Sequence, residues 1–181
     1  MPNSESHKKS PFIEYLTALT PENDRGTLAA LRRGLGVPPG EEVGMYRYVA
    51  PFVPDSERGR EREKIYYLVA SLYAYHRLST DEGNFGAHMA KAASLSTDVT
   101  ATERRFTALL GARLEDLADV LRQAVSFLRS KDVEINWQAL FDDLRRWDYP
   151  NKPVQRRWAN AFWAYRKPAG EEESAGAATV I

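Results

Sequence analysis

The sequence predicts an all-α protein, a compact bundle of about seven or eight helices. Three observations support this class: apolar residues recur at spacings of three and four, no segment alternates like a strand, and no hairpin dipeptide of the Asn-Gly type occurs. A length of 181 residues with 43% hydrophobic residues is enough for one domain with a full core. An arrangement as two helical lobes joined by a long loop is compatible with the same observations.

Two short helices are expected within the first 40 residues. Pro11 is suited to the first turn of a helix, because its missing N–H would have no intrahelical partner there. A second helix runs from about Asp24 to the segment 34–39, which is rich in Gly and Pro. The residues expected on their inner sides are Phe12, Leu16, Leu19, Leu28, Leu31 and Leu35.

The clearest helical pattern lies between residues 65 and 76. Its core-facing residues recur at spacings of three and four, which predicts a single apolar stripe. The preceding segment, Glu57 to Lys64, alternates in charge and is typical of a solvated helical face. Before it, a short apolar piece from Met45 to Val49 is stopped by Pro51 and Pro54. The stripe consists of Ile65, Leu68, Val69, Leu72, Tyr73 and His76.

Residues Ser79 to Val99 lose this periodicity and contain Gly83, Gly86 and several Ser and Thr residues. We therefore expect a long loop with about one helical turn, and loops of this length are often functional or mobile. Thr100 and Glu103 then have the spacing of a capping box, which predicts the start of the next helix.

Four further helices are expected between residues 100 and 167. Ile135 and Asn136 have the pattern of a hydrophobic staple and an N-cap for the third of them, and Pro150 and Pro153 separate it from the last. The inward-facing residues are Phe106, Leu109, Leu110, Leu117, Val120, Leu121, Ala124, Val125, Leu128, Trp137, Leu140, Phe141, Leu144, Val154, Trp158, Phe162 and Tyr165.

The two ends of the sequence differ in composition from the middle. Residues 1–10 are expected to form a disordered tail, residues 11–167 the helical domain, and residues 168–181 a disordered acidic tail with three Glu and no basic residue. The sequence has no Cys, no signal-peptide pattern and no apolar run of ~20 residues. These features predict a soluble, cytoplasmic protein without a membrane partner.

Catalytic chemistry has little support in the sequence. His7 lies in the N-terminal tail, His76 lies on the apolar stripe where a packed histidine is expected, and His88 has no neighbour at ligand spacing. Adjacent carboxylates such as Asp142 and Asp143 diverge by about 100° on a helix and indicate solvated faces. The sequence therefore predicts a protein that is not an enzyme and that uses no metal or cofactor.

Arginine is the unusual feature of the composition, because 18 of the 25 basic residues are Arg. A guanidinium group donates paired hydrogen bonds to phosphate oxygens and stays charged, which favours contact with a nucleic-acid backbone. Solvated faces paired with Glu or Asp explain the composition equally well. Adjacent arginines occur at Arg32/Arg33, Arg104/Arg105, Arg145/Arg146 and Arg156/Arg157.

Tryptophan is a second residue type that can contact nucleic acid, by stacking on unpaired bases. Trp137 and Trp158 fall on inward stripes, which favours core packing for both. Trp163 faces elsewhere and is the better candidate for a surface position at a protein interface.

A series of short motifs runs from the second expected helix to the last. In order they are Asp24-Arg25-Gly26, Leu31-Arg32-Arg33, Tyr46 to Phe52, Glu103 to Phe106, Leu121-Arg122, Asn136-Trp137, Leu144 to Trp147, and Trp158 to Phe162. Their order and spacing resemble the CasB family, the small subunit of the type I-E CRISPR surveillance complex, Cascade. The resemblance covers about Phe12 to Tyr165.

This resemblance implies an all-helical subunit without nuclease activity, present as two copies along the belly of the complex. It implies contacts with the backbone and large subunits, with crRNA, and with target DNA whose displaced strand lies in a basic groove. Carried over onto this sequence, the groove comprises Arg32, Arg33, Arg47, Arg104, Arg105 and Arg122. The family pattern is looser at five further candidates, some of which are expected to serve ion pairs between subunits: Arg25, Arg113, Arg145, Arg156 and Arg157.

Two other functions remain open at this point. A DNA-binding regulator with a helix-turn-helix would have the same Arg content, although no tight helix pair with a polar recognition helix is visible. A structural helical adaptor would use its arginines as salt-bridge partners.

Overall fold

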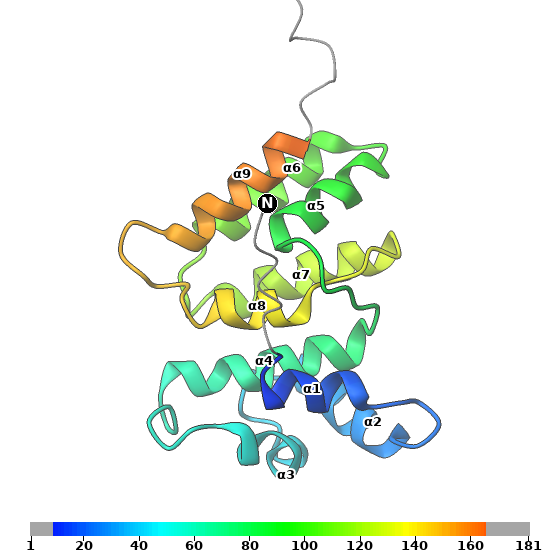
Figure 1. Ribbon diagram of the computed structural model, residues 1–181, viewed down its shortest axis with the longest axis vertical. Coiled ribbons are helices and arrows are strands. Elements are labelled where there is room, and N and C mark those ends of the chain that lie inside the picture. Colours follow the sequence, from blue (N-terminus) through cyan, green and yellow to red (C-terminus); the bar gives the residue numbers. More distant parts are fainter. Residues whose placement is uncertain (1–8, 166–181) are drawn as a thin grey trace, which may run out of the picture.

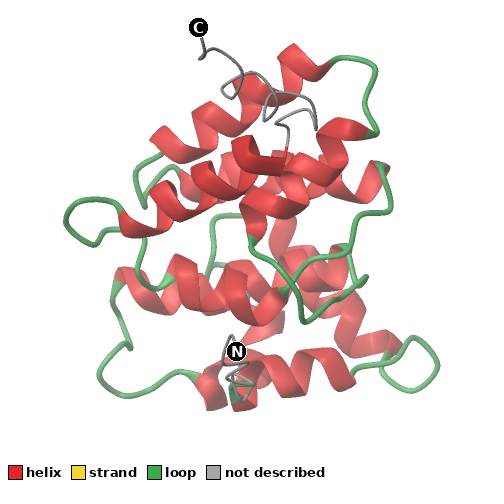
Figure 2. Cartoon of the chain, turned by 45° about the horizontal axis from the view of Figure 1, so that its top comes forward, coloured by secondary structure: helices red, strands yellow, loops and turns green. Residues whose placement is uncertain are grey.

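The computed structural model describes residues 9–165, and within this range the chain is all-α, as predicted (Figure 2). Residues 1–8 and 166–181, which include the predicted acidic tail, lie outside the described residues. Three 3₁₀ helices, Gly34–Gly36, Val43–Met45 and Ala50–Phe52, accompany the α-helices. The nine α-helices of the described range are α1 (Pro11–Ala18), α2 (Arg25–Arg33), α3 (Tyr46–Val49), α4 (Glu61–Tyr75), α5 (Phe85–Ser94), α6 (Val99–Gly111), α7 (Leu117–Ser130), α8 (Trp137–Leu144) and α9 (Pro153–Tyr165).

The helices are arranged in two halves that share one core. Figure 1 shows α1 to α4 below and α5 to α9 above, with α4 packed against α7 and α8 at the boundary. Pairs of aromatic rings are in contact across this boundary. The ring centroids of Phe12 and Phe141 are 5.2 Å apart, and those of Tyr73 and Trp137 are 5.5 Å apart. The buried apolar side chains form a single cluster, so the two halves are packed together and are not separate lobes on a linker.

Helix α4 is the centre of the molecule. All ten residues from Ile65 to Ala74 are buried, so the expectation of a single apolar stripe is wrong. The physical reason is that α2 and α3 pack on one side of α4 while α7 and α8 pack on the other, and a helix covered all round is buried all round. The expected solvated start is also wrong at Glu57, which precedes α4 and is buried.

Helix α5 occupies the segment that the sequence predicts to be a long loop, so that prediction is wrong. Its buried residues are mostly small, and they let α5 approach α9 closely. A Cβ atom added to Gly86 would lie 2.1 Å from the carbonyl oxygen of Trp158. Alanine and glycine carry little hydrophobic signal, which explains why periodicity alone missed the helix.

The predicted helix starts are partly confirmed. Asn136 is the N-cap of α8, and its Oδ1 accepts a hydrogen bond of 2.9 Å from the backbone N–H of Ala139. The expected capping box at Thr100 is wrong, because α6 begins earlier. Its N-cap is Asp98, whose Oδ1 accepts from the N–H of Ala101 at 2.8 Å.

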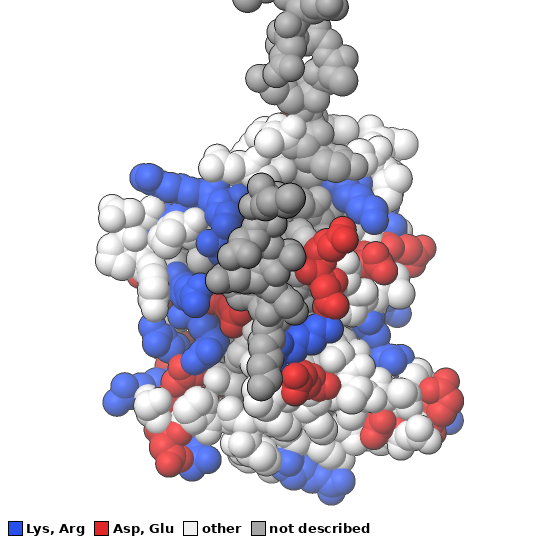
Figure 3. Space-filling view, in the orientation of Figure 1, with Lys and Arg blue, Asp and Glu red and all other residues white. Residues whose placement is uncertain are grey.

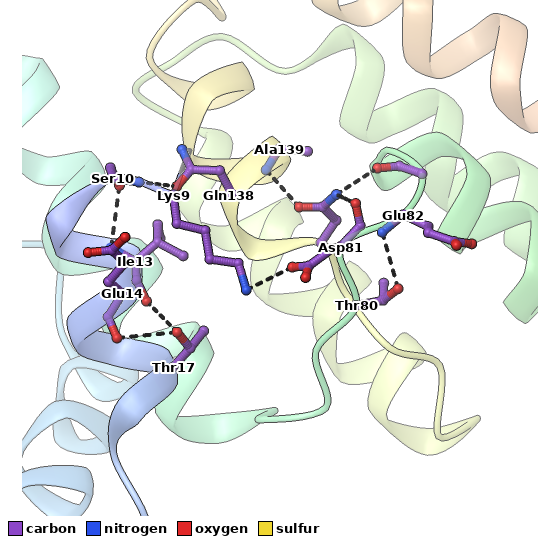
Figure 4. Close-up of polar contacts among 12 residues, drawn as sticks. Lys9, Ser10, Ile13, Glu14, Thr17, Thr80, Asp81, Glu82, Gln138 and Ala139 are labelled. Atoms are coloured by element: carbon purple, nitrogen blue, oxygen red, sulfur yellow. Dashed lines mark hydrogen bonds and ion pairs between the residues drawn. The ribbon is translucent and has the colours of Figure 1, made fainter. Parts of the chain in front are cut away.

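The segment before α1 ties the two halves together through polar contacts (Figure 4). The ammonium group of Lys9 lies 2.8 Å from a carboxylate oxygen of Asp81, which precedes α5. The backbone N–H of Ser10 donates to Oε1 of Gln138 on α8 at 2.7 Å, and the Ser10 hydroxyl caps α1. These contacts add to the apolar packing between the halves.

In residues 9–165, no helix has both the length and the apolar character that a membrane span needs.

Candidate nucleic-acid interface

The structure divides the eleven predicted arginines into two groups. Five of them contact carboxylates of the chain itself. Arg33 lies 3.7 Å from Glu42, and Arg113 lies 2.6 Å from Glu115. The full set of ion-paired candidates is Arg33, Arg113, Arg122, Arg145 and Arg157.

Arg145 is held by a buried partner. Its guanidinium donates to Oε1 of Glu57 at 2.6 Å, and only 9% of the Glu57 side chain is exposed. Burial by itself would lower the pKa of Arg145, but the hydrogen bond and charge of Glu57 raise it above the ordinary value. Burial also raises the pKa of the neighbouring Tyr66 to about 12. Arg145 therefore connects the end of α8 to the segment before α4, and this is a structural role.

Arg157 is placed in a similar way by Asp143. The Asp143 carboxylate accepts hydrogen bonds from Arg157 and, at 2.6 Å, from the indole N–H of Trp158. Burial raises the pKa of Asp143, and both hydrogen bonds oppose that rise. The interpretation of Asp143 as part of a solvated face is therefore wrong: it links α8 to α9 inside the core.

The other six candidates are exposed and have no carboxylate within 4.0 Å in the described part of the chain. Their contacts are uncharged: Arg47 lies over the ring of Tyr48 at 4.6 Å, and Arg105 lies over the ring of Phe127 at 5.7 Å. Such guanidinium groups keep their hydrogen-bonding edges available for an anion. The six are Arg25, Arg32, Arg47, Arg104, Arg105 and Arg156.

Two of these six arginines converge with a third on one hollow. Arg25 and Arg32 come from the same face of α2, and Arg77 follows α4; together they line a hollow of about 460 Å³. Nε of Arg32 donates to the carbonyl oxygen of Ala74 at 3.2 Å. The guanidinium group of Arg77 donates to the carbonyl oxygen of Leu19 at 3.1 Å. Neutral carbonyl anchors orient both groups without cancelling their charge. Glu22 also lines the hollow, and its negative charge partly offsets the positive charge of the arginines.

Sequence reasoning missed Arg77 and Arg129. Each is a single arginine with no motif around it, so only the fold could bring it to the others. Arg129 on α7 lies over the ring of Tyr75 at 4.2 Å, and the Tyr75 hydroxyl lies 3.2 Å from the hydroxyl of Ser126. This hydrogen bond, with a smaller contribution from Arg129, lowers the pKa of Tyr75. Arg129 therefore reaches from the second half of the chain to the end of α4.

Arg122 makes a second contact between the halves. It donates to the carbonyl oxygen of Val37 at 2.7 Å and to the Asp119 carboxylate at 2.9 Å, and only 20% of its side chain is exposed. This geometry gives Arg122 a positioning role at the boundary, with little surface left for a partner.

A further basic area covers one flank of the molecule. Figure 3 shows Lys and Arg gathered along its left side, at the level of the start of α9, the end of α8 and the start of α4. Sequence reasoning missed Arg60 and Arg62, because their segment alternates in charge. The residues of these segments that are exposed and have no carboxylate within 4.0 Å in residues 9–165 are Arg60, Arg62, Arg146, Lys152 and Arg156.

The histidines and tryptophans take structural places. His76 is buried, with Nε2 2.7 Å from the carbonyl oxygen of Val133, which confirms a packed histidine. His88 is also buried, and its Nε2 accepts from the N–H of Asn136 at 3.1 Å. Trp137 and Trp158 lie in the core and Trp163 is 43% exposed, as predicted. No group of three or more metal-binding side chains occurs in the described residues.

Comparison with known proteins identifies the family. Residues 27–163 match the family described as CRISPR-associated protein Cse2. A CRISPR-associated protein Cse2 from Thermus thermophilus is 38% identical over 164 residues, which is 90% of this chain and 92% of the relative.

Two solved structures agree with this match. The structure of M. ruber CasB has a TM-score of 0.72 and 33% identity, covering 86% of this chain and 92% of that chain. A chain of a CRISPR RNA-guided surveillance complex has a TM-score of 0.72 and 28% identity, covering 85% and 90%. This chain therefore belongs to the Cse2 or CasB family, the family of the small subunit of the type I-E CRISPR surveillance complex Cascade.

Proposed function

We propose that the protein is a non-catalytic subunit of a type I-E CRISPR surveillance complex that binds nucleic acid without reading its sequence. In this role it stabilises the R-loop by holding the displaced non-target DNA strand. Its partners would be crRNA, target DNA, the backbone and large subunits, and a second copy of itself. Support for the complex comes from the family and from the similar chain in a CRISPR RNA-guided surveillance complex.

One observation carries the nucleic-acid part of the proposal. Six of the eleven predicted arginines are exposed and have no carboxylate partner in the described residues, and two of them share a hollow with Arg77. The formal net charge of the protein is zero, yet no carboxylate of the described residues neutralises these six groups directly. Unpaired guanidinium groups on rigid helices suit the phosphates of a strand.

The mechanism follows from the near balance of R-loop formation. The RNA–DNA heteroduplex gained is about as stable as the DNA duplex lost, so modest contacts to the displaced strand shift the equilibrium. Arginines that neutralise phosphates release counterions, and this contribution does not depend on base sequence. A subunit that must serve every guide requires this kind of binding.

We also propose that the protein has no hydrolytic activity. His76 and His88 are both buried and engaged with backbone groups, so neither is available as a general base. Metal-dependent nicking of DNA by the purified protein, abolished by a point mutation in this chain, would contradict this proposal.

The test of nucleic-acid binding is a salt titration with the full-length chain. We expect weak binding to single-stranded and duplex DNA, without sequence preference and with an affinity that falls steeply with salt. Each phosphate contact contributes about −0.7 to the log–log slope for a single strand. A slope near zero would contradict the proposal and favour a structural adaptor, for which the five ion-paired arginines are the supporting observation.

A further inference from the structure

The turn after α8 presents an aromatic side chain that the core does not use. The side chain of Tyr149 is 46% exposed and has no ring contact or hydrogen bond with the described residues. The other exposed aromatic side chains of this range are engaged. The Tyr46 hydroxyl donates to the carbonyl oxygen of Gly40 at 2.8 Å, and Trp163 packs 5.7 Å from Phe106.

The backbone beneath Tyr149 is well fixed. Its N–H donates to the carbonyl oxygen of Arg146 at 3.1 Å, and its own carbonyl oxygen accepts from the N–H of Lys152 at 3.2 Å. Asn151 and Lys152 adopt left-handed backbone conformations, with φ of 65° and 50°. Residues other than glycine rarely adopt this conformation, and it is enriched at functional sites. The turn therefore holds an exposed ring on an ordered backbone.

Tyr149 lies between two hollows of about 460 Å³ each. The charged residues that line the first are Arg60, Arg62, Arg145, Glu57, Glu61 and Asp148. Those that line the second are Arg113, Lys152, Glu61, Glu115 and Asp148. Charged side chains of both signs therefore flank the ring.

The charge of this area remains positive after the internal ion pairs are removed. Glu57 pairs with Arg145, Glu61 with Lys64 and Glu115 with Arg113. Four charged groups lining the hollows then have no opposite charge within 4.0 Å in the described residues: Arg60, Arg62, Lys152 and the single acid Asp148. Figure 3 shows Lys and Arg gathered on the same flank, with some Asp and Glu among them.

We propose that Tyr149 is a stacking platform for one unpaired base of single-stranded DNA, with Arg60, Arg62 and Lys152 binding the flanking phosphates. This inference rests on the proposed function and adds a site to it. Single-strand binders combine a basic groove with aromatic rings, because every base has a face that can stack. A base in a duplex is already stacked on its neighbours. The site therefore separates single strands from duplexes, which phosphate contacts alone do only weakly.

The test compares Tyr149→Ala, Tyr149→Phe and the matched control Tyr46→Ala in the full-length chain. An oligothymidylate and a duplex of equal length are titrated at several salt concentrations. Tyr149→Ala should weaken single-strand binding by roughly 5- to 150-fold, the usual range for one stacked base. Its duplex affinity should change less than about twofold. Tyr149→Phe and Tyr46→Ala should behave like the wild type.

The salt dependence separates the roles of the residues. Loss of stacking should leave the log–log slope of Tyr149→Ala unchanged, whereas Arg60→Ala with Arg62→Ala should flatten it by about 0.7 for each lost contact. Wild-type binding that is salt-dependent but insensitive to Tyr149→Ala would overturn this inference and leave the proposed function standing. If Tyr149→Ala leaves DNA binding unchanged but is incorporated poorly into the complex, Tyr149 belongs to a protein interface. That outcome would also overturn the inference. Absence of salt-dependent binding in the wild type would contradict the proposed function itself.

Discussion

At the scale of single residues, adjacent arginines have different roles. Arg145 and Arg146 are neighbours in the sequence, yet Arg145 is paired with buried Glu57 while Arg146 is exposed without a carboxylate partner in the described range. Removing one partner of a buried ion pair leaves an uncompensated charge, which costs far more than removing a surface charge. Composition and motif cannot distinguish these two cases; burial can.

We therefore predict that Arg145→Ala destabilises the protein and Arg146→Ala does not. The loss for Arg145→Ala should be about 3 kcal/mol, because Glu57 remains buried without its partner. Arg146→Ala should change the free energy of unfolding by less than about 0.5 kcal/mol. Urea denaturation of the two variants measures both values. Equal losses would contradict the claim that the ion pair between Arg145 and Glu57 stabilises the fold.

His88 provides a prediction about pH. Burial lowers the pKa of His88 to about 4, whereas an unfolded histidine titrates near 6.5. Between pH 4 and pH 6.5 the unfolded state binds a proton that the folded state does not. The stability that depends on a neutral His88 is therefore fully present above about pH 6.5 and is lost as the pH falls toward 4. The loss attributable to this residue should be on the order of 3 kcal/mol.

The measurement compares unfolding free energies at several pH values in wild type and His88→Gln. The variant removes the titrating group, so its stability should fall less steeply between pH 6.5 and 4. Carboxylates contribute to both proteins and cancel in the comparison. Parallel pH profiles would contradict the assignment of this proton to His88.

At the scale of elements, the contact between α5 and α9 depends on small side chains. We predict that Gly86→Ala destabilises the protein by about 1–3 kcal/mol or more, because the new methyl group would overlap the Trp158 backbone. Gly111, at the end of α6, is the matched control, since a Cβ atom there meets open space. Gly111→Ala should be neutral or stabilising by up to about 1 kcal/mol.

Thermal and urea unfolding of the two glycine variants test this contact. If Gly86→Ala were as stable as Gly111→Ala, the close approach of α5 to α9 would have to be wrong. Circular dichroism is the control, because both variants should retain the helical content of the wild type.

The elements also show what could be predicted from the sequence. Large apolar residues at helical spacing predicted α2, α7 and α8, and the Asn136 cap was predicted because a cap is a local pattern. Helix α5 was missed because its core face is built largely from Gly and Ala, whose burial depends on α9. The burial of α4 on every side was missed for a related reason: periodicity describes one helix and not the number of neighbours around it.

At the scale of the whole molecule, the fold groups arginines that are far apart in the sequence. Arg25, Arg32 and Arg77 meet at one hollow, and Arg129 reaches the end of α4 from the other half. The motifs identified the family, and six of the eleven arginines predicted from the sequence are exposed without a carboxylate partner in the described residues. They could not separate paired from unpaired arginines, since Glu57 and Asp143 lie 88 and 14 residues from their partners and are brought to them only by folding.

The most direct test of the central claim is protection of the displaced strand in the assembled complex. The complex is reconstituted with wild-type protein, with a variant carrying Arg32→Ala, Arg104→Ala and Arg105→Ala, or with the ion-paired control Arg113→Ala. Permanganate reactivity of the non-target strand then reports its exposure after R-loop formation. We predict that the triple variant is incorporated normally but leaves the strand more reactive, increasingly so as salt is raised, while Arg113→Ala matches the wild type. Full protection by a fully incorporated triple variant would contradict the claim that the unpaired arginines hold the displaced strand.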